Sequence, residues 1–292
     1  MTNKKIAIYN GFSFHYEMFG YIIHYCKTKK YDLIIYSDDN LGYKDYYNTL
    51  FSIEYRDVSL FNSERENYDY IFLMTDDDWS YKTDNIHNTI CIDHYYKIRN
   101  HVFINRIATR PFSNEYYRKW ALPIYPIPNI NEINEINEIN IVLLSDDSTY
   151  NINVLKRLKS NNKIILHAIS RSMTIERFKN IDIEIQIYRN IDTTQLINIL
   201  SKASYVITDV SESKKYATEI ISGSVPLAFS TLTPLIISKE TNSYYKFKNV
   251  IEFDKNSMEP IVLHDINIDD LKKERDELIQ NNHTLFDSII EF

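Results

Sequence analysis

The sequence predicts an α/β protein with two parallel-sheet domains that face a central cleft. Short apolar runs alternate with helical patterns in both halves of the chain, which is typical of parallel strands covered by helices on both faces. Between the halves stands the triplet repeat NEINEINEIN at 131–140, whose isoleucine spacing fits neither a helical period of about 3.6 nor a strand period of about 2. We therefore expect a first domain at 1–128, a linker at 129–140 and a second domain at 141–292.

The first half holds several apolar runs of strand length and one long segment of helical pattern. The predicted strands cover 6–9, 33–36, 70–74 and 89–92, and the predicted helix covers 14–29. The helix presents Met18, Ile22, Ile23 and Cys26 on one face, so we expect that face to be buried.

The second half repeats the alternation. The predicted strands cover 141–144, 163–166, 183–187, 205–208 and 226–228. Asp192 and Gln195 have the spacing of a capping box, which predicts a helix start at Asp192. A second helix at 214–222 is expected to end at Gly223 in the left-handed conformation, and 268–292 is expected to form one or two helices.

The composition is that of a soluble globular protein, with 44% hydrophobic and 25% charged residues among 292. No apolar run reaches the ~18 residues of a membrane span, and the segment MTNKKIAIYNGF leads into a strand without a signal peptide. Cys26 and Cys91 lie in apolar elements, which favours buried thiols in a reducing cytoplasm. A net charge of −7 without a basic stripe argues against nucleic acid as a partner. The abundance of Ile, Asn, Lys and Tyr is typical of AT-rich genomes such as those of large DNA viruses.

The segment 182–228, DIEIQIYRNIDTTQLINILSKASYVITDVSESKKYATEIISGSVPLAF, resembles the nucleotide-sugar half of GT-B glycosyltransferases. In that family a helix carries a glutamate followed by small residues and a proline, here Glu219, Ser222, Gly223 and Pro226. The resemblance implies two Rossmann-like domains and metal-independent transfer of a hexosyl or related sugar. The donor would be a UDP- or GDP-sugar, the acceptor a glycan or glycoconjugate hydroxyl, and no further cofactor would be required.

Two features of many family members are absent. A second glutamate eight positions before Glu219 would fall on Ser211, and the Gly-Arg and Lys that often hold the diphosphate are replaced by SDDS at 145–148. Both retention and inversion of configuration therefore stay open.

The expected donor site lies at one edge of the second sheet. Glu219 can accept hydrogen bonds from ribose hydroxyls. Cations at strand ends and at a helix start can meet the negative charge of the leaving diphosphate. The donor-binding candidates are Arg171, Arg189, Lys214, Lys215, Thr218, Glu219, Ser222 and Gly223.

On the acceptor side, the loop NGFSFHYEMFG at 10–20 follows the first strand and holds His15. An imidazole with an ordinary pKa near 6.5 can take the proton of the acceptor hydroxyl, so His15 is the first candidate base. Asp93 and His94 stand at the end of another predicted strand and form the alternative, in which the aspartate orients the histidine.

Three alternatives stay open. The motif TDDDW at 75–79 could hold Mg²⁺ or Mn²⁺ through Asp76 and Asp78, as in metal-dependent GT-A glycosyltransferases. The same two-domain architecture also serves nucleotide-sugar epimerases. It could equally serve a non-catalytic module that binds sugar nucleotides or glycans.

Overall fold

The computed structural model describes residues 3–75, 87–98, 103–112, 119–128, 138–144, 151–170, 174–211 and 218–291. The chain forms two compact units, and each is described by itself. The first consists of Met1–Tyr125 together with Leu278–Phe292, and the second of Pro126–Glu277.

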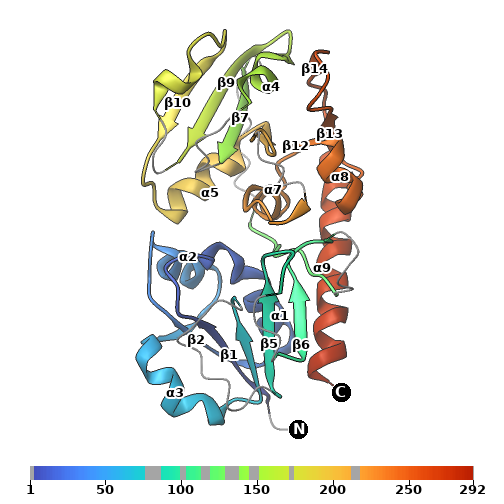
Figure 1. Cartoon of the computed structure of the whole chain (residues 1–292). Helices are drawn as coiled ribbons and strands as arrows, with labels where there is room; N and C mark the ends of the chain where they lie inside the picture. The colour runs from blue at the N-terminus through green and yellow to red at the C-terminus, as the bar shows by residue number, and fades with distance from the viewer. Residues whose placement is uncertain are drawn as a thin grey trace. The chain divides into compact units, whose positions relative to one another are not determined.

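The first unit is built on a six-stranded parallel sheet with the order β3-β2-β1-β4-β5-β6, drawn in blue to green in Figure 1. Its strands are β1 (Lys5–Asn10), β2 (Asp32–Ser37), β3 (Glu54–Arg56), β4 (Tyr70–Leu73), β5 (Thr89–Asp93) and β6 (Asn105–Ala108). The order of the strands reverses between β1 and β4. In open parallel sheets ligands bind outside the carboxyl ends of the strands at such a switch point.

Helices cover both faces of this sheet. They are η1 (Tyr16–Met18), α1 (Gly20–Lys29), α2 (Tyr43–Leu50), η2 (Val58–Leu60), α3 (Phe61–Glu64) and η3 (Arg65–Asn67), joined by the last part of α9 (Ile268–Ile290). Alternate strand residues point to opposite faces. Leu73 of β4 packs in the cluster that contains Phe61 of α3, whereas Phe72 meets Phe286 of α9 with ring centroids 5.4 Å apart. Two buried layers therefore hold the sheet.

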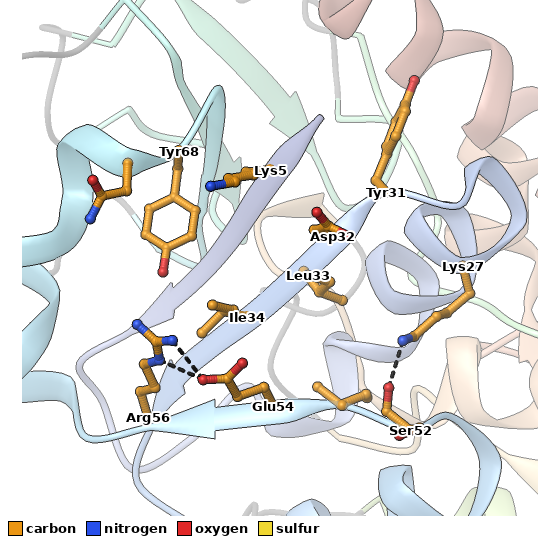
Figure 2. Close-up of a pocket in the computed structure, with 12 residues that line it drawn as sticks. Lys5, Lys27, Tyr31, Asp32, Leu33, Ile34, Ser52, Glu54, Arg56 and Tyr68 are labelled. Atoms are coloured by element: carbon orange, nitrogen blue, oxygen red, sulfur yellow. Dashed lines mark hydrogen bonds and ion pairs between the residues drawn. The ribbon is translucent and has the colours of Figure 1, made fainter. Parts of the chain in front are cut away.

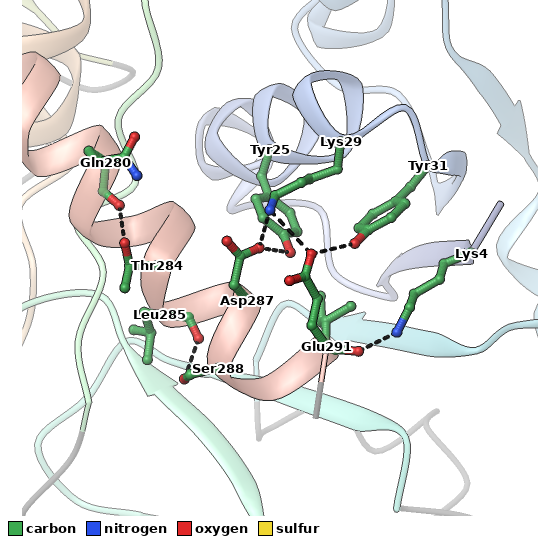
Figure 3. A network of polar contacts seen from close by, with 11 residues as sticks. Lys4, Tyr25, Lys29, Tyr31, Gln280, Thr284, Leu285, Asp287, Ser288 and Glu291 are labelled. Carbon is green, nitrogen blue, oxygen red and sulfur yellow. Dashed lines mark hydrogen bonds and ion pairs between the residues drawn. The ribbon is translucent and has the colours of Figure 1, made fainter. Parts of the chain in front are cut away.

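The last part of α9 is bound to the first unit by apolar and polar contacts. Phe286 is fully buried and contacts the rings of Tyr21 and Phe72. At the rim, Lys29 forms an ion pair with Asp287 at 2.7 Å, within the network of Figure 3. Both of these charged side chains are about one third exposed, so the pair contributes at most about 1 kcal/mol. The buried rings supply most of the stabilisation, since each contributes about 1.5–3 kcal/mol.

The second unit repeats the same design. Its six-stranded parallel sheet has the order β10-β9-β7-β11-β12-β13, which reverses between β7 and β11. The strands are β7 (Glu138–Leu144), β9 (Lys163–Ile169), β10 (Glu184–Tyr188), β11 (Tyr205–Ile207), β12 (Leu235–Ser238) and β13 (Val250–Phe253), beside a small pair of β8 (Leu158–Lys159) and β14 (Ile261–Val262). The helices are α4 (Ile152–Lys156), η4 (Ile175–Phe178), α5 (Thr193–Lys202), α7 (Ser224–Thr231), α8 (Lys239–Tyr245) and the first part of α9.

Most predicted elements of regular structure are confirmed. The runs predicted as strands at 6–9, 33–36, 70–74, 89–92, 141–144, 163–166, 183–187 and 205–208 are β1, β2, β4, β5, β7, β9, β10 and β11. The capping box of α5 is present in both directions, since Asp192 accepts from the Gln195 amide and the Gln195 side chain accepts from the Asp192 amide. The helix predicted at 14–29 is divided into η1 and α1.

The strand predicted at 226–228 is wrong, because this apolar run lies inside helix α7. Every residue of α7 is buried, and a helix that is buried on all sides shows no apolar stripe. Pro226 lies in the first turn, where its missing N–H breaks no helical hydrogen bond. Gly223 has φ −58°, so it precedes α7 as its N-cap and does not close a helix. The left-handed residue is Leu232 at the end of α7, with φ 56°.

The domain limits differ from the expected ones in two places. The contacts divide the chain after Tyr125, and 138–140 of the expected linker already belong to β7. The rest of that linker, 129–137, lies outside the described residues. The segment expected as one or two helices is the single helix α9, whose residues from Leu278 onward belong to the first unit.

Both cysteines are buried free thiols, as expected from the sequence. Among the described residues, no helix combines the length and apolar character that crossing a membrane requires.

Candidate functional site

The first candidate site lies at the switch point of the first sheet, where the loops after β1, β4 and β5 meet. The loop after β1 carries His15, the residue after β4 is Met74, and the residue after β5 is His94. All three loops leave the carboxyl ends of parallel strands, so the sheet order brings them together. The structure thus joins two of the three residues predicted on the acceptor side.

Asn10 shapes the loop that carries His15. Its buried side-chain amide donates to the carbonyls of Phe12, at 3.0 Å, and Phe14, at 2.9 Å. These bonds hold the loop in a tight turn, and His15 then takes a left-handed conformation with φ 71° as it leads into η1. The left-handed His15 keeps Phe14 and His15 out of the predicted helix, so helical structure begins only with η1.

The rings of His15 and His94 are stacked, with centroids 3.8 Å apart and an interplanar angle of 9°. His94 Nε2 lies 2.5 Å from the carbonyl oxygen of Met74. Because a carbonyl only accepts, His94 carries a proton on Nε2 and donates it. This bond fixes the orientation of the His94 ring and thereby the surface on which His15 rests.

The electrostatics of the stack favour a neutral His15. Burial lowers the pKa of His15 well below 6.5, and the neighbouring His94 lowers it further. Its Nε2 atom is buried and has no hydrogen-bond partner among the described residues. With its proton on Nδ1, a neutral His15 would offer the lone pair of Nε2 as a proton acceptor.

Asp93 takes another role than the one expected. Its carboxylate pairs with Arg106 on the neighbouring strand β6, with Arg106 Nε 3.0 Å from Asp93 Oδ2 and a second, shorter contact from the other end of the guanidinium. The two side chains are 2% and 9% exposed. Adjacent residues of a strand point to opposite sides, so Asp93 turns toward β6 while the ring of His94 turns toward Met74 and His15.

The corresponding edge of the second unit carries a buried polar network. Asp209 follows β11 in a left-handed conformation with φ 61°, which aspartate tolerates better than most residues. One of its oxygens accepts from the hydroxyl of Ser238, at the end of β12, and from that of Thr241 at 2.5 Å. The other pairs with Lys255, which follows β13. The loops after three strands are thus tied together at one edge.

A second chain of hydroxyls lies beside it. The Ser222 and Ser224 hydroxyls are 2.6 Å apart, and Ser224 donates to Thr208 Oγ1 at 2.9 Å. Ser224 is the first residue of α7 and Thr208 follows β11, so this chain positions the start of α7 at the sheet edge. Ser222 and Gly223, two predicted donor-binding residues, therefore lie beside this hydroxyl chain, directly before α7.

Glu219 is exposed and precedes α7. Within the described part of the chain its carboxylate has no hydrogen bond or ion pair. The position eight residues further on is Leu227, buried in α7, and the position eight residues before is Ser211. No second carboxylate therefore stands at that spacing on either side of Glu219. Thr218 is half-buried.

Most of the other predicted cations, and both aspartates of the alternative metal site, lie outside the described residues. Arg189 is exposed directly after β10. Five predicted residues lie outside the described residues: Arg171, Lys214, Lys215, Asp76 and Asp78. Among the residues that the structure does describe, no three His, Cys, Asp or Glu side chains gather as metal ligands.

A pocket of about 680 Å³ lies at the opposite edge of the first sheet, around the amino ends of β1, β2 and β3 (Figure 2). Two of the cations that line it are engaged by neighbours, since Lys27 donates to the Ser52 carbonyl at 2.5 Å and Arg56 pairs with Glu54 at 2.7 Å. The loops of the switch point do not reach this edge. We therefore place the candidate site at the carboxyl edges.

Four residues near these sites were not predicted from the sequence: Asp209, Lys255, and Phe12 and Phe14, whose rings lie next to His15. Asp209 directly follows a predicted strand, and that position was the available signal. Lys255 follows β13, a strand that was not predicted from the sequence, so nothing marked it as a residue of this edge.

Comparison with known proteins identifies the fold. No family model and no curated protein sequence matches the chain. Several solved structures are similar along nearly its whole length. AviGT4, a glycosyltransferase involved in avilamycin A biosynthesis, superposes with a TM-score of 0.58 at 9% identity, covering 99% of this chain and 95% of its own.

Two further structures contain nucleotide ligands. HepE of Anabaena in complex with UDP-glucose has a TM-score of 0.54 at 12% identity, with 99% of this chain and 94% of its own covered. An α-glucosyltransferase in complex with UDP and a 13-mer DNA containing an HMU base has a TM-score of 0.55 at 10% identity, with 98% and 95% covered. The chain therefore has the fold of the GT-B glycosyltransferases, two parallel six-stranded sheets with helices, as the resemblance in the sequence implied.

Proposed function

We propose that the protein is a glycosyltransferase that moves a hexosyl or related sugar from a nucleotide-sugar to an acceptor hydroxyl. The observation that carries this proposal is the likeness to glycosyltransferase structures along nearly the whole chain, one of them bound to UDP-glucose. The proposal assigns the donor to the second unit and the acceptor to the first. UDP-sugars are the first donors to test, and GDP-sugars follow.

In the first unit His15 is the proposed base. Its lowered pKa keeps the imidazole neutral at physiological pH, and its Nε2 atom has no partner within the described residues. An acceptor hydroxyl against this nitrogen would satisfy it and pass its proton to it as the oxygen bonds to the anomeric carbon. The bond from that carbon to the nucleoside diphosphate breaks in the same reaction. The Met74 carbonyl and His94 would act as positioning groups, because they fix the surface beneath His15.

In the second unit Glu219 is the proposed partner of the ribose hydroxyls. Its exposed carboxylate, with no partner among the described residues, can accept two such hydrogen bonds. The hydroxyls of Ser222 and Ser224 and the ammonium of Lys255 lie in the loops of the same sheet edge, where they could donate to a diphosphate. Arg171, Arg189, Lys214 and Lys215 remain proposed phosphate ligands.

The test combines ligand binding and turnover. Thermal unfolding is followed with UDP, GDP, CMP, dTDP and their sugars, with and without Mn²⁺. A ligand at 100 times its Kd adds about 2.7 kcal/mol of stability, which a melting curve resolves. We expect a metal-independent shift for UDP or GDP that Glu219→Ala weakens. Glu277→Ala, an exposed carboxylate of the same unit, is the matched control and should keep the shift.

Turnover separates the chemistry from binding. His15→Gln should keep the nucleotide shift and lower kcat by about 10²–10⁴-fold, as removal of a general base does. The exposed His264→Gln is the control. A kcat within threefold of the wild type would remove His15 from the role of base. Conversion of donor without acceptor would favour an epimerase, a shift that requires Mn²⁺ would point to Asp76 and Asp78, and binding without turnover would indicate a non-catalytic module.

A further inference from the structure

An exposed aromatic platform adjoins the candidate base. The rings of Phe12 and Phe14 are stacked with centroids 4.8 Å apart and 17° between their planes. Phe14 also meets the ring of His15 edge-on, with centroids 4.6 Å apart. Phe14 is 44% exposed and is the only aromatic ring among the exposed large apolar side chains of the described residues. The stacked pair therefore presents an apolar face to solvent directly beside the candidate base, where a ligand can contact it.

The platform is held in place by the same contacts that shape the loop. The Asn10 amide binds the backbone carbonyls of Phe12 and Phe14, so neither ring is free to fold back onto the sheet with its backbone. From the neighbouring loop, the Asn40 amide donates to the Ser13 carbonyl at 3.2 Å. A ring that is presented by a fixed backbone can bind a flat ligand with little loss of conformational entropy.

The loop after β2, which the Asn40–Ser13 hydrogen bond joins to the loop of the platform, carries two carboxylates. Asp38 and Asp39 lie in that loop, and both contribute to raising the pKa of Tyr16, behind the larger effect of burial. The cation of the same segment, Lys44, points elsewhere, since its Nζ lies over the Tyr55 ring at 5.4 Å from the centroid. The field near Phe14 therefore disfavours anionic ligands.

Two classes of flat ligand can stack on a phenylalanine. A pyranose ring offers an apolar face of C–H groups, whose partial positive charge matches the negative face of an aromatic ring. A nucleobase stacks as well, but it brings phosphates along its backbone, and here these would meet Asp38 and Asp39. The surroundings of the platform favour the sugar.

We propose that Phe14, supported by Phe12, stacks against an uncharged pyranose ring of the acceptor and presents its hydroxyl to His15. This inference rests on the proposed function and adds the acceptor class, a neutral glycoside. It separates this chain from the α-glucosyltransferase whose structure contains DNA, although the two share the fold.

The test is saturation-transfer NMR with the full chain. The probes are methyl glucoside, cellobiose and N,N′-diacetylchitobiose, the charged analogue methyl glucuronide, and a single-stranded DNA oligomer. We expect at least one neutral glycoside to bind through its ring protons and the two anionic probes to bind more weakly. Phe14→Ala should weaken the neutral glycoside about three- to tenfold, whereas Phe14→Trp should retain binding. Leu60→Ala, an equally exposed apolar side chain of the same unit, is the control.

A double variant tests the expected preference for uncharged ligands. Asp38→Asn with Asp39→Asn should reduce the difference in binding affinity between methyl glucoside and methyl glucuronide. Equal binding by Phe14→Ala and wild type, or a preference for DNA or the glucuronide, would overturn the inference. If no pyranose probe binds while UDP still shifts the melting point, the acceptor class is wrong and the donor assignment stands. If neither binds, the proposed function itself fails.

Discussion

Replacing Gly20 by alanine should destabilise the protein, although alanine is the better helix former. Gly20 is the first residue of α1, and the ring of Tyr125 lies directly against it. A Cβ atom at this position would stand 2.1 Å from Cε1 and 2.2 Å from Cδ1 of that ring. Carbon atoms pack best at about 3.5–4.0 Å, so the ring or the helix would have to move by more than 1 Å.

The surroundings leave little room for that movement. Tyr125 is 2% exposed, and its ring centroid lies 5.8 Å from that of Tyr47. The Tyr47 side chain is itself held in place, because its hydroxyl donates to the Tyr16 carbonyl. Overpacking of this kind costs about 1–3 kcal/mol, and the clash is severe enough for the upper end. The higher helix propensity of alanine returns at most about 1 kcal/mol, and less at a first helical residue. We expect a net loss of roughly 1–3 kcal/mol.

Urea unfolding of four variants measures this effect. Gly11→Ala is the control, because Gly11 is exposed and has no positive φ, and it should change the free energy of unfolding by less than about 0.5 kcal/mol. Tyr125→Leu removes the ring, and the double variant Gly20→Ala/Tyr125→Leu should lose less than the two single variants together. Additive losses, or a Gly20→Ala protein as stable as the wild type, would refute the steric argument.

Two further predictions concern buried charge and pH. Arg106→Met leaves the Asp93 carboxylate buried without its cation, so it should lower the free energy of unfolding by about 3–5 kcal/mol, measured in urea at pH 7. Adding Asp93→Asn should restore most of that stability. A loss below about 1 kcal/mol for Arg106→Met would contradict the prediction. Burial lowers the pKa values of His15, His167 and His283, so below pH 6.5 the unfolded chain binds more protons than the folded one. The free energy of unfolding should therefore fall as the pH drops from about 6.5 toward the folded pKa values, by at most about 1.4 kcal/mol per pH unit per histidine. His167→Gln should flatten that fall, and a slope equal to that of the wild type would count against it.

Local patterns allowed much of the fold to be predicted. The apolar runs of β1, β2 and β4 are flanked by polar segments, so the local sequence alone predicts that these strands are buried. The capping box at Asp192 and Gln195 involves residues three apart and depends on no other part of the chain. Such features need no tertiary information, which is why they were found.

The errors occur where tertiary contacts decide. The run at 225–229 has the apolar character of a buried strand and also of a helix that is buried on every side, and only its surroundings in the fold distinguish the two. The strands β6 and β13 carry polar residues such as Arg106 and Glu252, whose partners come from other strands or helices. Patterns along the chain therefore gave no signal for them.

The same difference applies to the candidate site. His15 and His94 were proposed because both follow predicted strands, whereas their stacking depends on the order of the sheet. The pairing of Asp93 with Arg106 crosses from one strand to the next and has no signature in the order of residues.

Helix α9 has a consequence for how the protein is made on the ribosome. The first unit contains residues up to Tyr125 but also those from Leu278 onward, including the fully buried Phe286. At about 5–20 residues per second, synthesis of the intervening segment takes on the order of ten seconds or more. Throughout that interval the rings that receive Phe286, such as Phe72, lack their contact with it. The part of the protein that emerges first is thus completed last, and until then it is the part that a chaperone would have to protect.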